Sequence, residues 1–443
     1  MFKINYSGVM SSAIGDGNGL TDREVKYYAE SFESIYKDFI IDKNNYGFVK
    51  ILDDPDVIKK SRDFYNNNKH FKNIVVLGIG GSALGLKAIL NLYSFSKIER
   101  NFYILDNIDP SYLKHIFEKI DLSQSLFFVI SKSGETVETL SQFLYAYSVV
   151  KKNNLDPKKH FVFITDPEKG FLRDISKKEG IITFDVPKDL GGRFSVLSYV
   201  GLLPAFFIGE DISEIIEGTK VIDKNFLETC LFSNILYLLN VRRGKSNVVF
   251  FHYGDRLEKF CQWFSQLWAE SLGKKFGNNG EILMTGQTPI VAKGVTDQHS
   301  QLQLYLEGPK DKVIIMIKSN DKVNLNIPEV FTEYDSVKYL SGKSFDILFD
   351  AEFKGTYGAL IKESVPTISI EIEELNLKTL GALFYFFELA TAYSGKLYNI
   401  NPFDQPGVEI GKRIAFSILG KSGYNEELLI KEELFKKYER TIA

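Results

Sequence analysis

Residues 74–92 read Ile-Val-Val-Leu-Gly-Ile-Gly-Gly-Ser-Ala-Leu-Gly-Leu-Lys-Ala-Ile-Leu-Asn-Leu. Residues 74–77 form an apolar run, 78–83 form a glycine-rich turn, and the remainder has the pattern of a helix. This order predicts a β-strand over 74–77 and a helix over 84–92, which is the beginning of a βαβ unit. Glycines in such a turn let backbone N–H groups approach an anion at the start of the helix.

The same succession of short apolar runs, polar loops and helical stretches continues outward from this unit. Further strands are expected over 102–105, 126–130, 161–165 and 181–186, and a second series over 248–251, 312–317, 345–349 and 367–372. Strands that alternate with helices are typical of parallel sheets with both faces covered. The pattern predicts an α/β protein with two doubly wound αβα-sandwich domains, mainly parallel sheets, and helical N- and C-terminal segments.

The expected units are a helical arm over 1–65, a first α/β domain over 66–210, and a second over 211–443 that ends in C-terminal helices. In the arm, apolar residues at helical spacing predict one helix over 20–42, with Thr21 or Asp22 as its N-cap. Charged, helix-prone sequence over 431–440 predicts a final solvated helix.

The composition limits the function classes. Of 443 residues, 44% are hydrophobic and 25% are charged, which is typical of soluble globular proteins and excludes a disordered or fibrous chain. The formal net charge of −3 provides no basic field for nucleic-acid binding. The two cysteines, Cys230 and Cys261, are too few for a disulfide framework, so a reducing cytosol is expected. The longest apolar run, 196–209, is shorter than the ~20 residues of a membrane span.

Ligands of open α/β sheets bind beyond the carboxyl ends of the strands, so the loops there carry the functional hypotheses. The first loop has the form Gly78-x-Gly80-x-x-Ala83, and Asp106 stands at the end of the next strand. This nearly matches the dinucleotide fingerprint with its ribose-binding acid. An NAD-dependent enzyme and a tight turn without a ligand both remain open from this loop.

The loop after 126–130 is crowded with hydroxyl groups. Ser131, Ser133, Thr136 and Thr139 surround the start of the next helix. Their O–H groups can donate hydrogen bonds while the positive helix end favours a dianion, which suits a terminal phosphate monoester. Ordinary N-capping explains one hydroxyl rather than four, so the loop favours a phosphate monoester as ligand.

Two further residues have the chemistry of acid–base and oxyanion catalysis. Arg193 lies in residues 189–195, Asp-Leu-Gly-Gly-Arg-Phe-Ser, where two glycines permit a sharp turn that presents the guanidinium to a cleft. Glu270 lies in the last turn of an apolar helix over 257–272, where the helix dipole disfavours a carboxylate and favours its use as a general base. A surface arginine and a solvated helical glutamate are the alternatives.

His299 and Lys412 complete the candidates. Thr296 is the expected N-cap of a helix that has His299 at its third position, where the positive helix end keeps the imidazole neutral and able to relay a proton. Lys412 shares a helix face with Val408, Gly411, Ala415 and Leu419. A lysine within such a stripe either snorkels to its edge or is held as a buried proton donor. No His or Cys cluster argues for a metal.

Together these motifs resemble the glucose-6-phosphate isomerase family. Two long matches carry the resemblance, residues 189–195 and residues 402–412, Pro-Phe-Asp-Gln-Pro-Gly-Val-Glu-Ile-Gly-Lys. Residues 78–82 and 131–139 are similar to the family's sugar-phosphate loops, and 269–274 to the segment that carries its base. The length matches the compact bacterial form. The resemblance implies two sugar-isomerase (SIS) domains and the reversible isomerisation of glucose 6-phosphate and fructose 6-phosphate, in glycolysis and gluconeogenesis.

The resemblance also implies roles for the candidate residues. The phosphate of the sugar would lie on Ser131, Ser133, Thr136 and Thr139, and the sugar would be held with the help of Gly81 and Ser82.

The remaining candidates would carry the reaction. His299 and Lys412 would open the sugar ring, and Glu270 would move a proton between C2 and C1. Arg193, with Gln405, would stabilise the charge of the enediolate that forms between these steps.

The resemblance further implies that no metal or nucleotide cofactor is needed. The expected partner is a second copy of the chain, in a homodimer in which the segment bearing His299 completes the neighbour's active site, in the cytoplasm, with no nucleic acid and no membrane. Three alternatives remain: an NAD-dependent dehydrogenase, a non-catalytic sugar-phosphate sensor, and an amidotransferase that makes glucosamine 6-phosphate. Phe2 stands where the last would need a cysteine nucleophile.

Overall fold

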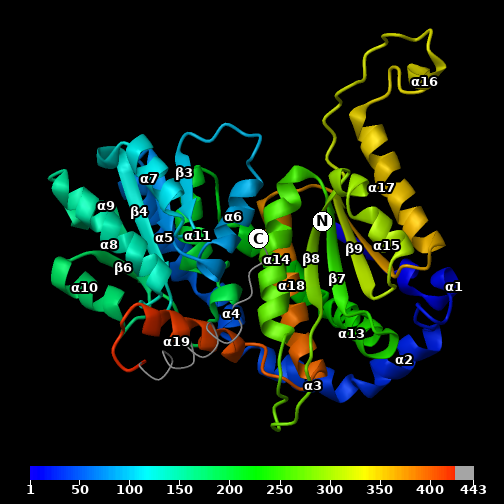
Figure 1. Cartoon of the computed structure of the whole chain (residues 1–443), viewed down its shortest axis with the longest axis horizontal. Coiled ribbons are helices and arrows are strands. Elements are labelled where there is room, and N and C mark those ends of the chain that lie inside the picture. The colour runs from blue at the N-terminus through cyan, green and yellow to red at the C-terminus, as the bar shows by residue number, and fades with distance from the viewer. Residues whose placement is uncertain (425–443) are drawn as a thin grey trace, which may run out of the picture.

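The computed structural model describes residues 1–424 and contains two α/β lobes on either side of a group of central helices (Figure 1). The first lobe has a five-stranded parallel sheet in the order β3-β2-β4-β5-β6. Every residue of β2, β4 and β5 is buried, as expected for central strands with helices on both faces. The strands are β2 (Asn73–Leu77), β3 (Asn101–Leu105), β4 (Ser125–Ser131), β5 (Phe161–Thr165) and β6 (Ile182–Asp185), and all five predictions for this part of the chain are confirmed.

Alternate residues of these strands face two helical layers, because successive side chains of a strand point to opposite faces. Ile74 and Val76 pack in the core that includes Phe64 of α5, whereas Val75 and Leu77 pack in the core of α7 and α8. The helices of this lobe are α5 (Pro55–Asn68), α6 (Leu84–Asn91), α7 (Pro110–Lys119), α8 (Val137–Lys152), α9 (Pro157–His160), α10 (Phe171–Glu179) and α11 (Tyr199–Ala205).

The second lobe has a five-stranded sheet in the order β1-β10-β9-β7-β8, in which only β1 is antiparallel to its neighbour. Its strands are β1 (Phe2–Asn5), β7 (Asn247–Tyr253), β8 (Thr288–Gly294), β9 (Lys312–Ser319) and β10 (Thr367–Ile372). The strands predicted over 248–251, 312–317 and 367–372 are confirmed. The two that the sequence pattern missed, β1 and β8, are edge strands, and β8 contains Pro289, which weakens a strand signal.

The strand predicted over 345–349 is wrong, because these residues begin helix α17 (Phe345–Lys362). The Ser344 side chain caps the helix by accepting a hydrogen bond from the backbone N–H of Ile347. Phe349 and Phe353, one helical turn apart, both contact the ring of Tyr253. A short apolar run does not reveal its period, so the sequence alone did not distinguish strand from helix here.

The N-terminal segment departs from its prediction in one respect. The single helix expected over 20–42 is two helices, α2 (Asp22–Ser31) and α3 (Glu33–Lys43), with a break at Phe32. Thr21 is the N-cap, and it forms a capping box with Glu24. The helix predicted over 431–440 lies outside the described residues.

The central helices include α18, which is buried along almost its whole length against α12, α13 and α14. Among the described residues, we find no helix with the length and apolar character needed to cross a bilayer. The helices not yet given are α1 (Ser11–Ile14), α4 (Gly47–Lys50), α12 (Glu214–Lys224), α13 (Phe226–Arg243), α14 (Glu258–Leu272), α15 (Leu302–Glu307), α16 (Asp335–Lys338), α18 (Leu377–Leu397) and α19 (Glu409–Ile418).

Helix α18 contains a fully buried carboxyl group, Glu388, whose two oxygens have no hydrogen-bond partner among the described residues. Burial raises the pKa of Glu388 well above its ordinary value of 4.5, because the charged form loses its hydration. Above about pH 4.5, the folded state therefore keeps a proton on Glu388 that the unfolded state releases. This carboxyl favours folding at low pH, and the contribution is lost as the pH rises.

We expect Glu388→Gln to become more stable relative to the parental protein as the pH rises from about 5 to 8, because the amide does not titrate. The difference in unfolding free energy should grow by up to about 1.4 kcal/mol per pH unit. Urea unfolding at several pH values measures it, with the exposed Glu374→Gln as control. A difference that does not change with pH would show that Glu388 is ionised in the folded state.

Candidate active site

Two glycine loops of the first lobe are pressed together beside the central helices. The 3-10 turn η3 (Gly80–Ser82) follows β2, and the 3-10 turn η5 (Gly192–Phe194) follows β6. A Cβ atom on Gly81 would lie 2.2 Å from the carbonyl oxygen of Gly192, so the close approach requires glycine. The contact places Arg193 beside the predicted sugar-binding loop.

The Arg193 guanidinium joins η5 to two segments of the second lobe, the end of α14 and the loop 402–405. It donates five hydrogen bonds: from Nε to Ser271 Oγ (2.7 Å), from Nη1 to Gln405 Oε1 (2.7 Å) and Glu270 Oε2 (3.3 Å), and from Nη2 to the carbonyl oxygens of Pro402 (2.5 Å) and Asp404 (2.9 Å).

These contacts correct the expectation that Arg193 presents free donors to a cleft. A guanidinium has five N–H groups, and all five are engaged. The side chain is 2% exposed. Burial lowers the pKa of Arg193, and the charges of Glu270 and Asp404 oppose this shift. An oxyanion would gain an Arg193 hydrogen bond only by displacing Glu270 or Gln405, so the residue first of all holds these groups in place.

Glu270 lies in the last turn of α14, as predicted, and its two carboxylate oxygens are held from different directions. Oε1 accepts from Gln266 Nε2 at 3.0 Å, and Oε2 accepts from Arg193. The side chain is 31% exposed, so this carboxylate, unlike the guanidinium, is open to a ligand. A fixed and accessible carboxylate has the geometry of a general base.

Gln266 and Lys274 belong to the site but were not predicted as site residues. Gln266 lies one helical turn before Glu270, a spacing that places two side chains together on a helix. The buried Lys274 ammonium donates to the carbonyl oxygens of Glu270 (2.7 Å) and Asp404 (2.6 Å), and burial lowers the pKa of Lys274. It therefore caps the end of α14 and holds the loop that bears Gln405.

The hydroxyl cluster lies between the end of β4 and the start of α8. Ser131 Oγ is 2.8 Å from Thr136 Oγ1, and Ser133 Oγ accepts from the backbone N–H of Glu135 at 3.2 Å. Thr136 is the N-cap of α8, yet its side chain makes no capping hydrogen bond. In the described part of the chain, the first-turn N–H groups of this 16-residue helix thus have no side-chain acceptor, which suits an anion.

The placement of Thr139 differs from its prediction. It lies inside α8 and is completely buried, and its Oγ1 has no hydrogen-bond partner among residues 1–424. Its hydroxyl is therefore not available at the helix start as Ser133 and Thr136 are, because a residue three positions into a helix faces the core at this point.

His299 does not lie at the third position of a helix. It is the last residue of the 3-10 turn η8 (Thr296–His299), whose N-cap is Val295, so Thr296 is the first residue of the turn and not its cap. The imidazole is exposed. No hydrogen bond joins it to Glu270 or Arg193, so one copy of the chain, as far as it is described, does not bring all predicted catalytic groups together.

Lys412 also differs from its prediction, since its helix face is not buried. The side chain is half-exposed on α19 and pairs with Glu409 at 2.9 Å. The apolar residues that flank it, including Val408 and Leu419, are exposed as well. Of the C-terminal candidates, Gln405 alone reaches Arg193 directly.

The hypothesis of a dinucleotide site also depended on Asp106 as the acid that binds the ribose. Asp106 is held in an ion pair with Lys87 of α6 through its Oδ2, which gives this carboxylate a structural role within the first lobe. In the described part of the chain, no group of three or more His, Cys, Asp or Glu side chains is arranged to hold a metal ion.

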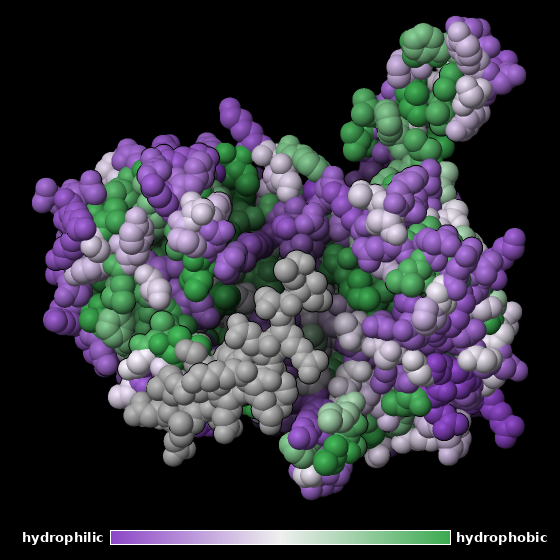
Figure 2. All heavy atoms as spheres, viewed as in Figure 1, coloured by the Kyte–Doolittle hydropathy of each residue, from purple (hydrophilic) through white to green (hydrophobic). Residues whose placement is uncertain are grey.

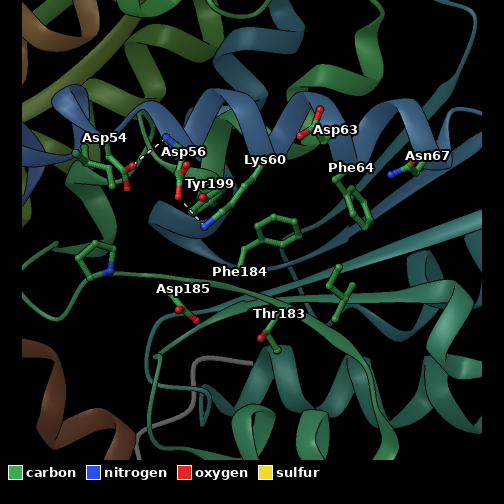
Figure 3. A pocket seen from close by; sticks show the side chains of 13 residues that line it. Asp54, Asp56, Lys60, Asp63, Phe64, Asn67, Thr183, Phe184, Asp185 and Tyr199 are labelled. Carbon is green, nitrogen blue, oxygen red and sulfur yellow. Dashed lines mark hydrogen bonds and ion pairs between the residues drawn. The ribbon is translucent and has the colours of Figure 1, made fainter.

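A separate cavity of about 520 Å³ lies between α5 and the edge strand β6 (Figure 3). Its lining includes Asp54, Asp56, Asp63 and Asp185 with a single cation, Lys60, which pairs with Asp56. Carboxylates in this number disfavour a phosphate. None of the predicted site residues lines this cavity. The candidate active site is therefore the group of Arg193, Gln266, Glu270, Ser271 and Gln405, called the Arg193 cluster below.

Comparisons with known proteins match nearly the whole chain. The family model described as phosphoglucose isomerase matches residues 59–428. The chain is 39% identical over 436 residues to a probable glucose-6-phosphate isomerase of Methanococcus maripaludis, with 96% of each chain covered. It is 37% identical over 455 residues to a glucose-6-phosphate isomerase of Carboxydothermus hydrogenoformans, covering 98% of this chain and 97% of that one.

Solved structures have the same fold. A hypothetical protein of Thermus thermophilus superposes with a TM-score of 0.84 at 30% identity and covers 95% of this chain and 100% of its own. A glucose-6-phosphate isomerase of Chlamydia trachomatis superposes with a TM-score of 0.76 at 24% identity, covering 86% of this chain and 76% of its own.

Proposed function

The chain belongs to the phosphoglucose isomerase family and is an aldose–ketose isomerase of glucose 6-phosphate and fructose 6-phosphate, and we propose that it works through the residues gathered around Arg193. The observation that carries this proposal is the Glu270 carboxylate, which is fixed by Gln266 and Arg193 yet remains accessible. The two units proposed from the sequence, 66–210 and 211–443, supply the phosphate loop and the base respectively.

In the proposed mechanism the sugar phosphate binds at the start of α8, on Ser131, Ser133 and Thr136. Gly81 and Ser82 hold the sugar. Thr139 has no direct contact with the phosphate in this mechanism, because its hydroxyl is buried inside α8.

The proton transfers follow from this placement. His299 and Lys412 move protons at the ring oxygen and hydroxyl to open the ring. Glu270 then takes the proton from C2 of the aldose, which leaves an enediolate, and returns it to C1 to give the ketose. Arg193 contributes its charge near the enediolate and holds Gln405 toward the site. These steps use no metal and no nucleotide.

The proposed assembly is a homodimer in which His299 serves the neighbour's site. The imidazole of His299 is exposed and, among the described residues, makes no hydrogen bond to Glu270, which supports this arrangement. Further support comes from the segment between β9 and α17, which projects from the second lobe and carries apolar side chains on its surface (Figures 1 and 2). Exposed apolar groups of this segment include Val323, Leu325, Phe331, Tyr334 and Tyr339. Such a surface is typical of a protein–protein contact.

The proposed location is the cytoplasm. Both cysteines, Cys230 and Cys261, are free and buried, and burial raises the pKa of each thiol. Thiols of this kind are stable in a reducing compartment.

The first experiment is an assay of the purified protein with fructose 6-phosphate in EDTA without added metal, in which a coupled dehydrogenase reports glucose 6-phosphate. Rapid product formation is expected. Saturable binding of fructose 6-phosphate without product would contradict the isomerase and favour the sugar-phosphate sensor.

We expect His299→Ala to lose turnover of cyclic fructose 6-phosphate by about 10²-fold or more, since a general acid–base group contributes this much. An open-chain substrate analogue should retain most of the parental rate, because it needs no ring opening. The exposed His115→Ala on α7 serves as control. Equal losses with both substrates would contradict the proposed role of His299 in ring opening.

A further inference from the structure

The turn that carries His299 is held by its neighbours rather than by His299 itself. The imidazole is exposed and makes no hydrogen bond in residues 1–424. The backbone of η8 sets where this side chain begins, and the rotamer then sets the direction of the ring. Any group that fixes this backbone therefore fixes the point from which the imidazole extends.

Gln298 connects the turn to two other elements of the second lobe. Its Nε2 donates to Tyr253 Oη at 2.7 Å, to the carbonyl oxygen of Glu352 at 3.3 Å, and to Thr356 Oγ1. Tyr253 is fully buried at the end of β7, and Thr356 is buried on α17. The amide thus connects a short turn to a strand paired on both sides and to an 18-residue helix.

The acceptor side of this connection is itself well fixed. The ring of Tyr253 packs edge-on against Phe349 and Phe353, with centroid distances of 5.7 and 5.0 Å. A Cβ on Gly294, the last residue of β8, would lie 2.5 Å from the same ring, so glycine leaves the space that the ring fills. Burial raises the pKa of Tyr253, which keeps the phenol protonated at neutral pH.

Within residues 1–424, the hydrogen bonds of the adjacent Asp297 are local, to Lys293, Ser300 and Gln301. Its Oδ2 accepts from the backbone N–H of Lys293 at 2.6 Å, and its Oδ1 accepts from Ser300 Oγ at 2.5 Å. These bonds shape the turn on its own strand but do not reach β7 or α17. Gln298 is the side chain of η8 that makes this longer connection.

We propose that Gln298 is a positioning residue for His299, which holds η8 to Tyr253 and Thr356 so that the imidazole points to the ring oxygen of the sugar. The proposal rests on the proposed function, in which His299 moves protons during ring opening. A group displaced by about 1 Å loses up to about 10²-fold in rate. Gln298 itself touches no substrate in this mechanism.

The experiment is a double-mutant cycle of Gln298→Met and His299→Ala with fructose 6-phosphate. Methionine keeps the length of the side chain but donates no hydrogen bond. In the parental background, kcat is expected to fall between about 10-fold and 10²-fold, with KM near the parental value. In the His299→Ala background, Gln298→Met is expected to cause no further loss, because its effect passes through the missing imidazole.

The matched control is Gln303→Met, which makes the same chemical change at an exposed position of α15. If Gln298→Met folds poorly, Thr356→Val removes one acceptor of the amide and keeps the side-chain shape. It should give a smaller loss that is again absent without His299. Equal losses in both backgrounds, or parental activity of Gln298→Met, would overturn the role of Gln298 but leave the proposed function standing. Parental activity of His299→Ala would overturn the proposed role of His299 as well.

Discussion

Glu270→Gln is expected to bind fructose 6-phosphate with near-parental affinity and to lose about 10²–10⁴-fold in kcat, the range of a missing general base. The amide has the size of the carboxylate, and its oxygen can still accept from Gln266 or Arg193. It cannot take the proton from C2. Solvent deuterium should therefore no longer enter the sugar at C1 or C2, which NMR of the product pool measures independently of the coupled assay.

The control for this variant is Glu258→Gln in the first turn of the same helix, where the carboxylate pairs with Lys259 and lies outside the Arg193 cluster. It should retain parental turnover. Near-parental kcat in Glu270→Gln, or deuterium exchange at the parental rate, would show that another group carries the proton.

Arg193→Met is expected to be destabilised by about 3–5 kcal/mol and to be inactive, because the buried Ser271 hydroxyl loses its partner and each buried polar group left unpaired costs about 1–3 kcal/mol. The change also leaves the carbonyl oxygens of Pro402 and Asp404 without their donor. Arg193→Lys should lose less stability because it keeps the charge, yet it should lose activity because an ammonium cannot match the five-donor fork. Urea unfolding and kcat measure the two effects.

Arg62→Met provides the matched control, since Arg62 is an exposed arginine in a surface ion pair with Asp211. A surface change of this kind costs within about 0.5 kcal/mol. An Arg193→Met variant as stable as the control would show that the five hydrogen bonds of Arg193 do not hold the two lobes together at this point.

Most secondary structure could be predicted because its signals are local. The fully buried strands β2, β4 and β5 are runs of apolar residues between turn-forming residues, and Thr21 with Glu24 forms a capping box readable within four positions. The failures have the same origin. Residues 345–349 are too few to show a helical period, and the edge strand β8 packs too little surface to need an apolar sequence.

The candidate site could be predicted in part, since Arg193, Glu270 and Gln405 were named and the structure brings them together. The partners of their hydrogen bonds could not be predicted from the sequence. All five N–H groups of Arg193 donate to other residues of the protein. Two of the acceptors, Ser271 and Gln405, lie 78 and 212 positions away in the sequence. The positions of His299 and Lys412, exposed rather than at a helix start or in a buried stripe, likewise depend on how distant elements pack.

The sequence by itself determined the α/β class, the strands of the first sheet, the hydroxyl-rich loop 131–136 and the proposal of Glu270 as the base. These follow from hydrophobic period, turn chemistry and motifs, each contained within a few residues. Only the tertiary structure decided that Gln266 and Lys274 fix the base and its loop, that Thr139 is buried, and that Gln298 connects the His299 turn to α17. Hydrogen-bond partners far apart in the chain are set by packing, and no local pattern encodes which of them meet.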